Sequence, residues 1–323
     1  MFSGETAQTW LEKGAEAFAN MRTAEAAQDF QKAVEADPHS VKAQLSLGVI
    51  YLFQYQNGVA EQPDRMGDVS SGPRTLTPAE VAAKAEKRRA QIAEQNATNA
   101  ARAEEHLKQA VQLDPRCEPA MEYLAALYFW WRDPASEVWQ VWARRDDARH
   151  WYAQIAERNL QHRYAHYACG VIDYNKAFVL IRSTSGFPRP LADEETRRSL
   201  RAKVGPLLEN SAANFLRARE IDPNNSDAMT YLGFVKNDEA YIAETMDDSA
   251  RLRAEAADWH RKVDQINAAH AKATGQPWPP GDTATITFER IPGKPPIPSF
   301  PPDARFMIPP APPPPPPPPA FKR

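Results

Sequence analysis

The chain has 323 residues, of which 42% are hydrophobic and 25% charged, so it is long enough for two ordinary domains or one long repeat array. Its 39 Lys and Arg residues nearly balance its 42 Asp and Glu residues. This balance argues against nucleic acid as the main partner, because such binding usually needs a concentrated basic surface. The two cysteines, Cys117 and Cys169, form no CxxC pair, which excludes a disulfide framework.

The sequence also bears on the cellular location. No run of 18 apolar residues is present, so we expect no transmembrane helix. The first residues, MFSGETAQTWLEKGAEAF, lack a basic segment followed by an apolar one, and the sequence as given therefore predicts no signal peptide. We expect a cytoplasmic protein. A periplasmic or secreted location is the alternative if the N-terminus is processed or starts elsewhere.

Residues 1–274 are predicted to be helical almost throughout, because good helix formers carry apolar residues at three- and four-residue spacing. Three similar segments each end in an aspartate-proline pair: DFQKAVEADP, EHLKQAVQLDP and NFLRAREIDP. In each segment an aromatic residue or Leu lies eight residues before the proline, and Ala lies five before it. Beyond each proline a further helix is predicted, marked by the pairs Leu47-Gly48, Leu124-Ala125 and Leu232-Gly233.

This repeated pattern resembles the tetratricopeptide (TPR) family, whose unit has the form W-x2-L-G-x2-Y…A-x3-F…P. The first repeat matches that form at Trp10, Gly14, Ala26, Phe30, Ala33 and Pro38. It departs from the form at Lys13 and Ala17, where Leu and Tyr are usual. The resemblance covers about residues 8–274 in about five repeats. It implies an all-α fold, a TPR-type α-solenoid of stacked helix pairs with a proline-rich C-terminal tail.

Two of the repeats are longer than an ordinary unit. The interval from the repeat glycine to the proline is 24 residues in the first repeat, 67 in the second and 53 in the fourth. We therefore place insertions at about residues 52–97 and 174–203. In the first of these, Thr77 caps a helix that starts at Pro78, and no helix breaker follows until Pro115. We predict one helix from Pro78 to about Leu113, roughly 50 Å long, whose first half projects from the array.

The segment QHRYAHYACGVIDY raises the question of a metal site. His162, His166, Cys169 and Asp173 share one helical stripe, and each can bind a metal ion. Alignment of the fourth repeat on Gly170 places the last three at positions that the TPR unit uses for internal packing. We favour packing, and a metal-binding protein that uses the stripe remains the alternative.

The sequence also lacks four motifs that are typical of enzymes: HExxH, GxGxxG, GxxxxGK[ST] and GxSxG. We therefore predict no enzyme, no catalytic residue and no cofactor.

The TPR resemblance implies an inner groove lined by the first helix of each repeat. The residues that we predict to bind a partner there are mostly aromatic: Phe18, Leu52, Phe53, Phe129, Trp130, Tyr167, Tyr174, Asn175 and Phe234. The resemblance also argues against one partner class. TPR co-chaperones grip a C-terminal carboxylate of heat-shock proteins with Lys, Asn and Arg side chains, and the corresponding positions here hold Leu11, Ala15, Ser46, Pro119 and Tyr123.

Residues 275–323 form a separate, proline-rich tail. They contain 19 of the 30 prolines, with eight in a row from Pro312, so we predict a mostly disordered, extended or polyproline II segment. Thr283–Phe288 alternates with period two and predicts one short strand.

We expect a non-catalytic scaffold that binds a peptide or protein segment in the groove of residues 1–274. The alternative is that the protein fills its own groove and the tail is the working interaction element.

Overall fold

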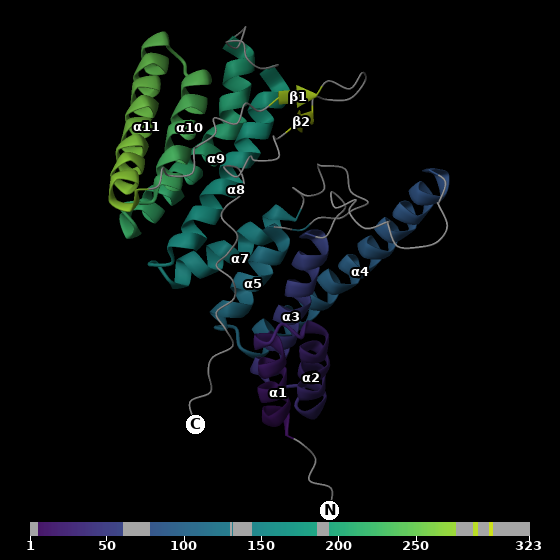
Figure 1. The fold of residues 1–323 in the computed structure, drawn as a ribbon. Coiled ribbons are helices and arrows are strands. Elements are labelled where there is room, and N and C mark those ends of the chain that lie inside the picture. Colours follow the sequence, from purple (N-terminus) through teal and green to yellow (C-terminus); the bar gives the residue numbers. More distant parts are fainter. Residues whose placement is uncertain are drawn as a thin grey trace, which may run out of the picture. The chain divides into compact units, whose positions relative to one another are not determined.

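The fold is described from a computed structural model, in which residues 6–60, 78–129, 131, 144–185, 194–275, 287–289 and 297–299 are described. The helices are α1 (Ala7–Ala19), α2 (Thr23–Ala36), α3 (Val41–Ala60), α4 (Pro78–Leu113), α5 (Glu118–Phe129), α7 (Arg145–Arg158), α8 (Arg163–Ser185), α9 (Glu194–Ile221), α10 (Ser226–Tyr241) and α11 (Met246–Thr274) (Figure 1). The chain divides into two compact units within α7, between Trp151 and Tyr152. The predicted all-α architecture is confirmed for the described residues up to Thr274.

A small antiparallel ribbon lies beyond the helical region. Strand β1 (Thr287–Glu289) pairs with β2 (Ile297–Ser299), and Phe288 lies opposite Pro298. The predicted strand at 283–288 is present at Thr287 and Phe288, and residues 283–286 lie outside the described part of the chain. The strand is not single: it has a partner, because a short strand needs a neighbour to pair its backbone groups.

A close contact between a glycine of one helix and a large side chain of the next recurs in four helix pairs. A Cβ atom added to any of these glycines would come within 2.6–2.8 Å of that side chain. The pairs are Gly14 with Phe30, Gly48 with Leu107, Gly170 with Phe215 and Gly233 with His260. The first three confirm the repeat pattern inferred from the sequence. The fourth supplies a register that the sequence did not reveal, since a histidine takes the place of the aromatic residue or Leu.

The junctions between helix pairs share one turn. The side-chain Oδ1 of Asp37, Asp114, Asn159 or Asp222 accepts a hydrogen bond from the backbone N–H two residues later, at 2.9–3.2 Å. The backbone N–H one residue further on donates to the C=O of the same Asp or Asn, at 2.9–3.2 Å. Asp and Asn favour this turn because their short side chains reach their own backbone. The aspartate-proline signal identified three junctions and missed the one at Asn159, where Leu160 replaces proline.

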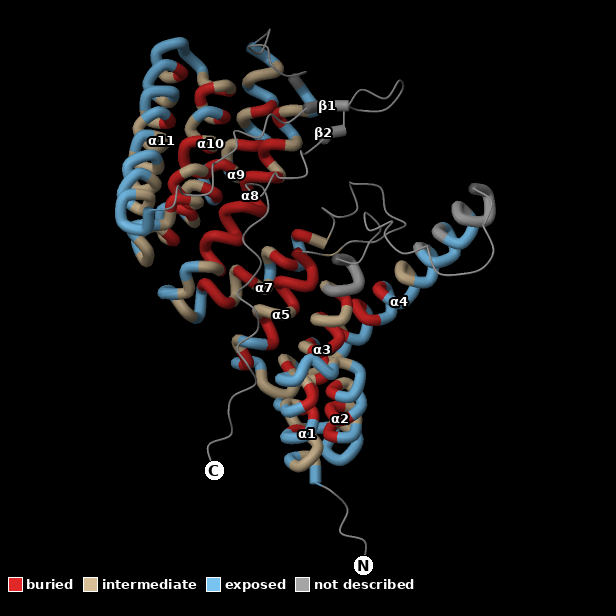
Figure 2. The backbone as a smooth tube through the Cα atoms, in the orientation of Figure 1, coloured by how far each residue is buried: buried red, intermediate tan, exposed pale blue. Residues whose placement is uncertain are grey.

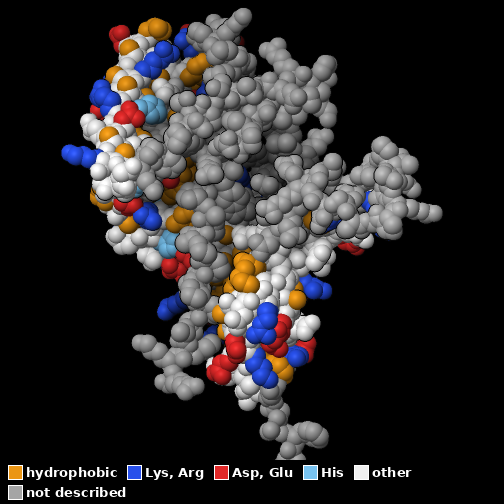
Figure 3. All heavy atoms as spheres, in the orientation of Figure 1, with side chains coloured by type: hydrophobic (Ala, Val, Ile, Leu, Met, Phe, Trp, Pro, Cys, Tyr) orange, Lys and Arg blue, Asp and Glu red, His pale blue; other side chains and the backbone are white. Residues whose placement is uncertain are grey.

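In the first unit, α4 is a single helix of 36 residues, as predicted. Its second half packs against α3, and Ala100, Ala103, Leu107 and Ala110 are buried. Its first half is largely exposed (Figure 2). Over α1 and α2, basic and acidic side chains intermingle on the surface (Figure 3).

In the second unit, α8 is buried at every residue from Ala165 to Asn175 (Figure 2). Its main neighbour is α9, where the Ser211 hydroxyl donates a hydrogen bond to the Gly170 carbonyl at 2.9 Å. The predicted insertion at 174–203 contains the end of α8 and the start of α9, with residues 186–193 outside the described part.

Gly275 ends α11 in the left-handed conformation, at a φ of 68°, one residue after the predicted end of the helical region. Across all described helices, none has both the length and the apolar character of a membrane span.

Candidate functional site

The predicted groove residues of the first unit differ in exposure. Phe18 of α1 and Phe53 of α3 are partly exposed, and their rings meet edge to face with centroids 5.3 Å apart. Leu52 and Phe129 are 4% and 1% exposed, so they belong to the core. Trp130 lies outside the described residues. Of the described residues predicted for the groove in this unit, Phe18 and Phe53 are therefore the two that remain partly accessible.

In the second unit, most of the predicted groove residues are covered by neighbouring helices. Tyr167 is 5% exposed and Tyr174 3%. Tyr231 of α10 contacts both rings, with centroids 5.9 Å and 5.5 Å away. Phe234 is only partly buried and stacks on Tyr174 at 6.2 Å. These rings pack α8 against α10, which are the first helices of adjacent repeats. The faces that we predicted to bind a partner are therefore used for packing between these two helices.

Two consequences of this burial are chemical. Removal from water raises the pKa of Tyr167 and of Tyr174 well above the usual value for tyrosine, so both phenols stay neutral. Asn175 is 1% exposed, and within the described chain its carboxamide has no hydrogen-bond partner. A buried carboxamide without a hydrogen bond lowers the stability of the fold. Asn175 is also not accessible to a partner in this structure, because its side chain does not face solvent.

The four residues of the supposed metal stripe comprise one helix cap and three buried residues. His162 precedes α8, and its Nδ1 accepts a hydrogen bond from the Ala165 backbone N–H at 3.0 Å. Ser40 and Asn225 make the same bond at the start of α3 and α10, to Ala43 at 3.3 Å and Ala228 at 2.9 Å. His162 is thus an N-terminal helix cap, a role for which Ser, Asn and Asp are usual.

The other three stripe residues are buried: His166, Cys169 and Asp173 are 8%, 2% and 2% exposed. Burial lowers the pKa of His166 and favours its neutral form. Its Nδ1 lies 3.5 Å from Asn214 Oδ1 on α9. Among the residues that the structure describes, these four do not gather their ligand atoms within 4.8 Å of one another. The arrangement supports helix packing as the reason for the stripe.

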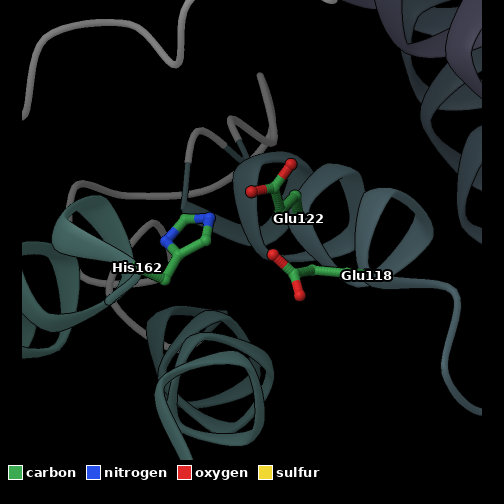
Figure 4. Close-up of side chains that lie close together, drawn as sticks. All are labelled: Glu118, Glu122 and His162. Carbon is green, nitrogen blue, oxygen red and sulfur yellow. The ribbon is translucent and has the colours of Figure 1, made fainter. Parts of the chain in front are cut away.

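Figure 4 shows His162 together with two carboxylates of α5. Glu118 and Glu122 are four residues apart and project from one side of α5. His162 belongs to the second unit and the two glutamates to the first, and we therefore assign them no common site.

One polar cluster of the second unit was not predicted. Arg182 near the end of α8 donates a hydrogen bond to Asp238 of α10, with 3.0 Å between Nη2 and Oδ1. Asp238 is 2% exposed. Burial raises its pKa to about 6, although Arg182 and a hydrogen bond from Tyr174 act in the opposite direction. The sequence carried no signal for this pair, because the two residues lie 56 positions apart on different helices.

The glycine contacts, the repeated turn and the helix pairs together define a TPR-type helical repeat architecture. No protein-family model matches the chain, and no curated protein sequence matches it either. The chain is similar to the solved structure of MamA, with 16% identity over 84% of this chain and 97% of that one and a TM-score of 0.47. It is also similar to YrrB, described as a TPR protein with an unusual peptide-binding site, with 14% identity, 84% and 94% coverage and a TM-score of 0.45.

A third similar structure is the human IFIT1 dimer with m7Gppp-AAAA. It shares 15% identity over 82% of this chain and 50% of that chain, with a TM-score of 0.33. At these identities and TM-scores no binding property transfers from the three proteins to this chain. The repeat architecture rests on the contacts within the chain itself.

Proposed function

We propose that this protein is a non-catalytic scaffold that binds a peptide or protein segment through the inner face of its first helices. The observation that carries the proposal is the Phe18–Phe53 pair, two adjacent and partly exposed rings on α1 and α3. Large rings that remain accessible on a repeat surface are the residue type that anchors protein interfaces. The near balance of 39 basic and 42 acidic residues supports a protein partner over a nucleic acid.

In the second unit, taken by itself, Phe234 is a partly exposed ring of the same kind, and the buried rings Tyr167 and Tyr174 hold the helices of that unit together. Leu52 and Phe129 have the corresponding supporting role in the first unit. The proposed contact surface is therefore smaller than the set of nine residues expected from the sequence.

The test is affinity capture from an extract of the source cells, followed by mass spectrometry. The wild-type chain is compared with Phe18→Ala/Phe53→Ala and with the control Leu180→Ala/Leu216→Ala. Leu180 and Leu216 are 39% and 38% exposed and lie on α8 and α9. We expect the same proteins on the wild type and the control, with at least tenfold depletion on the Phe variant. Equal capture by all three proteins would show that the aromatic pair is not the interface. Circular dichroism must show that the variants remain helical.

A further inference from the structure

A groove in the first unit lies away from the aromatic pair, between the second helices of the first two repeats. It has a volume of about 650 Å³, within the range of roughly 300–1,000 Å³ usual for ligand sites. One wall is a face of α2 with Gln28 and Gln31, and the other is a face of α4 with Gln91, Gln95 and Asn99. Tyr51 and Gln54 of α3 complete the lining, and the Gln54 carboxamide donates a hydrogen bond to the Thr23 carbonyl at 3.3 Å. The groove exists because α4 continues past the length of an ordinary second helix.

The hydrogen-bonding capacity of this groove is largely unused. Gln28, Gln91, Gln95 and Asn99 make no side-chain hydrogen bond in the described part of the chain. Asn99 is 7% exposed and lines the groove, and its carboxamide is not one of the buried groups that lack a partner. Its donor is therefore open to the groove and available to a ligand that enters it.

The chemistry of the lining defines the class of ligand. One carboxylate, Glu94, and one guanidinium, Arg102, line the groove, so their charges cancel. The remaining polar groups are mainly carboxamides, whose NH₂ groups donate hydrogen bonds. Ala24 and Ala27 leave space on the α2 wall. Tyr51 is 8% exposed and its ring stacks on His106 with centroids 5.9 Å apart, so it adds only a small aromatic surface to the groove. Such a groove suits an uncharged, extended chain that is rich in carbonyl acceptors.

The chain itself contains a segment with this chemistry. From Pro309 to Ala320 no residue is charged, and the eight prolines from Pro312 have carbonyl groups but no N–H donors. Their carbonyls cannot be paired within the tail, and the polyproline II conformation is already extended, which lowers the cost of ordering on binding. From Gly275 to Pro309 the tail can span roughly 100 Å at about 3.1 Å per residue. That reach is several times the radius of gyration of about 15 Å expected for a unit of this size.

We infer that the carboxamide groove between α2 and α4 is a docking site for the proline-rich segment 309–320 of this chain. The NH₂ groups of Gln91, Gln95 and Asn99 donate to proline carbonyls, and the Tyr51 ring contacts the pyrrolidine rings. Docking within one chain and docking between two copies use the same contacts. The site is separate from the Phe18–Phe53 surface, so the inference does not depend on the proposed function.

The experiment uses a full-length host chain in which Pro312–Pro319 is replaced by an alternating Gly-Ser sequence, which leaves the groove without its own ligand. The probe is the fluorescent, end-capped synthetic peptide IPPAPPPPPPPPA, followed by fluorescence anisotropy. We compare the host with Gln91→Glu/Gln95→Glu, which keeps the side-chain shape and removes the NH₂ donors. The matched control is Gln112→Glu/Gln265→Glu, since both of these glutamines are exposed on helices and lie outside the groove.

We expect the peptide to bind the host and the control equally, and the groove variant at least tenfold more weakly. The unmodified chain should bind the probe more weakly than the host, because its own tail competes at a high effective concentration. Absence of binding to the host at millimolar peptide, or equal binding to the groove variant, would overturn the inference. Equal binding of an uncharged Ser-Thr peptide of the same length would also overturn it, because the groove would then accept any neutral extended chain.

Discussion

The exposed half of α4 and the central part of α8 are both long stretches of regular helix, and they have opposite environments. In α4, the residues described from Ala83 to Gln95 are exposed or only partly buried, and their sequence is rich in Lys, Arg, Glu and Gln. In α8, every residue from Ala165 to Asn175 is buried. Helix formation and burial are therefore separate outcomes: good helix formers suffice for the first, whereas the second needs neighbouring helices on every side. In α8 these neighbours bury even the polar residues His166, Asp173 and Asn175.

The largest effect is expected where α9 packs on α8. Phe215 is fully buried, and its ring lies 4.9 Å from Tyr231 and 5.8 Å from Tyr167. Phe215→Ala should lower the free energy of unfolding by about 4 kcal/mol, through lost burial and the cavity left behind. Arg88→Ala, in the exposed half of α4, should change it by no more than about 0.5 kcal/mol. Urea denaturation measures both changes, and similar values for the two variants would refute the comparison.

The next effect is a pH dependence in the second unit. The pKa of Asp238 is raised from 3.8 to about 6 in the folded protein, so folding favours the protonated form. Its contribution to stability is complete below pH 4 and is lost as the pH rises through about 6, by about 3 kcal/mol in total. The difference in unfolding free energy between the wild type and Asp238→Asn should therefore change by most of that amount, about 2 kcal/mol, between pH 4 and pH 7. A difference that is constant with pH would show that Asp238 titrates normally.

A smaller loss is expected from the close approach of α8 and α9. A Cβ atom on Gly170 would lie 2.8 Å from the Phe215 ring, so Gly170→Ala should cost about 2 kcal/mol of stability through overpacking. Gly170→Ala combined with Phe215→Leu should cost less than the sum of the two single changes, because the shorter side chain makes room. A double-mutant cycle by urea denaturation measures this coupling. Strict additivity would mean that the two residues do not touch.

The smallest effect concerns the helix cap of α8. His162→Ala removes the acceptor for the Ala165 N–H and should cost about 1 kcal/mol. His162→Asn should retain wild-type stability, because Asn225 already caps α10 in the same way. Thermal unfolding with and without zinc provides the contrast with a metal site. A zinc-dependent midpoint that disappears in His162→Asn would contradict the capping role.

Sequence reasoning worked best where one local rule decides the outcome. Pro78 marked the start of α4 and Pro115 its limit, since the geometry of a helix end depends on a few neighbouring residues. The repeat glycines were inferred from the match between the repeats and the TPR form, and their close contacts confirm that pattern. His260 was missed because its role depends on Gly233 of the preceding helix. The turn at Asn159 was missed because the search relied on proline, although the side chain of Asp or Asn makes the bond.

The candidate site shows the limit of the same reasoning. The sequence placed Tyr167, Tyr174 and Asn175 on a first helix, but it could not tell whether the next helix would cover them. Tyr231 and Phe234 of α10 decide that question, and they lie more than 55 residues away. For Phe18 and Phe53 the outcome is different, because their rings pack on each other and remain partly exposed.

The sequence by itself determined the helices, their approximate ends and the glycine-centred repeat, because these depend on backbone propensity and on side chains a few positions apart. Only the tertiary structure decided which polar groups would lose contact with water. The Arg182–Asp238 pair and the carboxamide groove each combine residues from separate helices. Burial depends on every neighbour in space at once, and a pattern along one helix records only the neighbours on that helix.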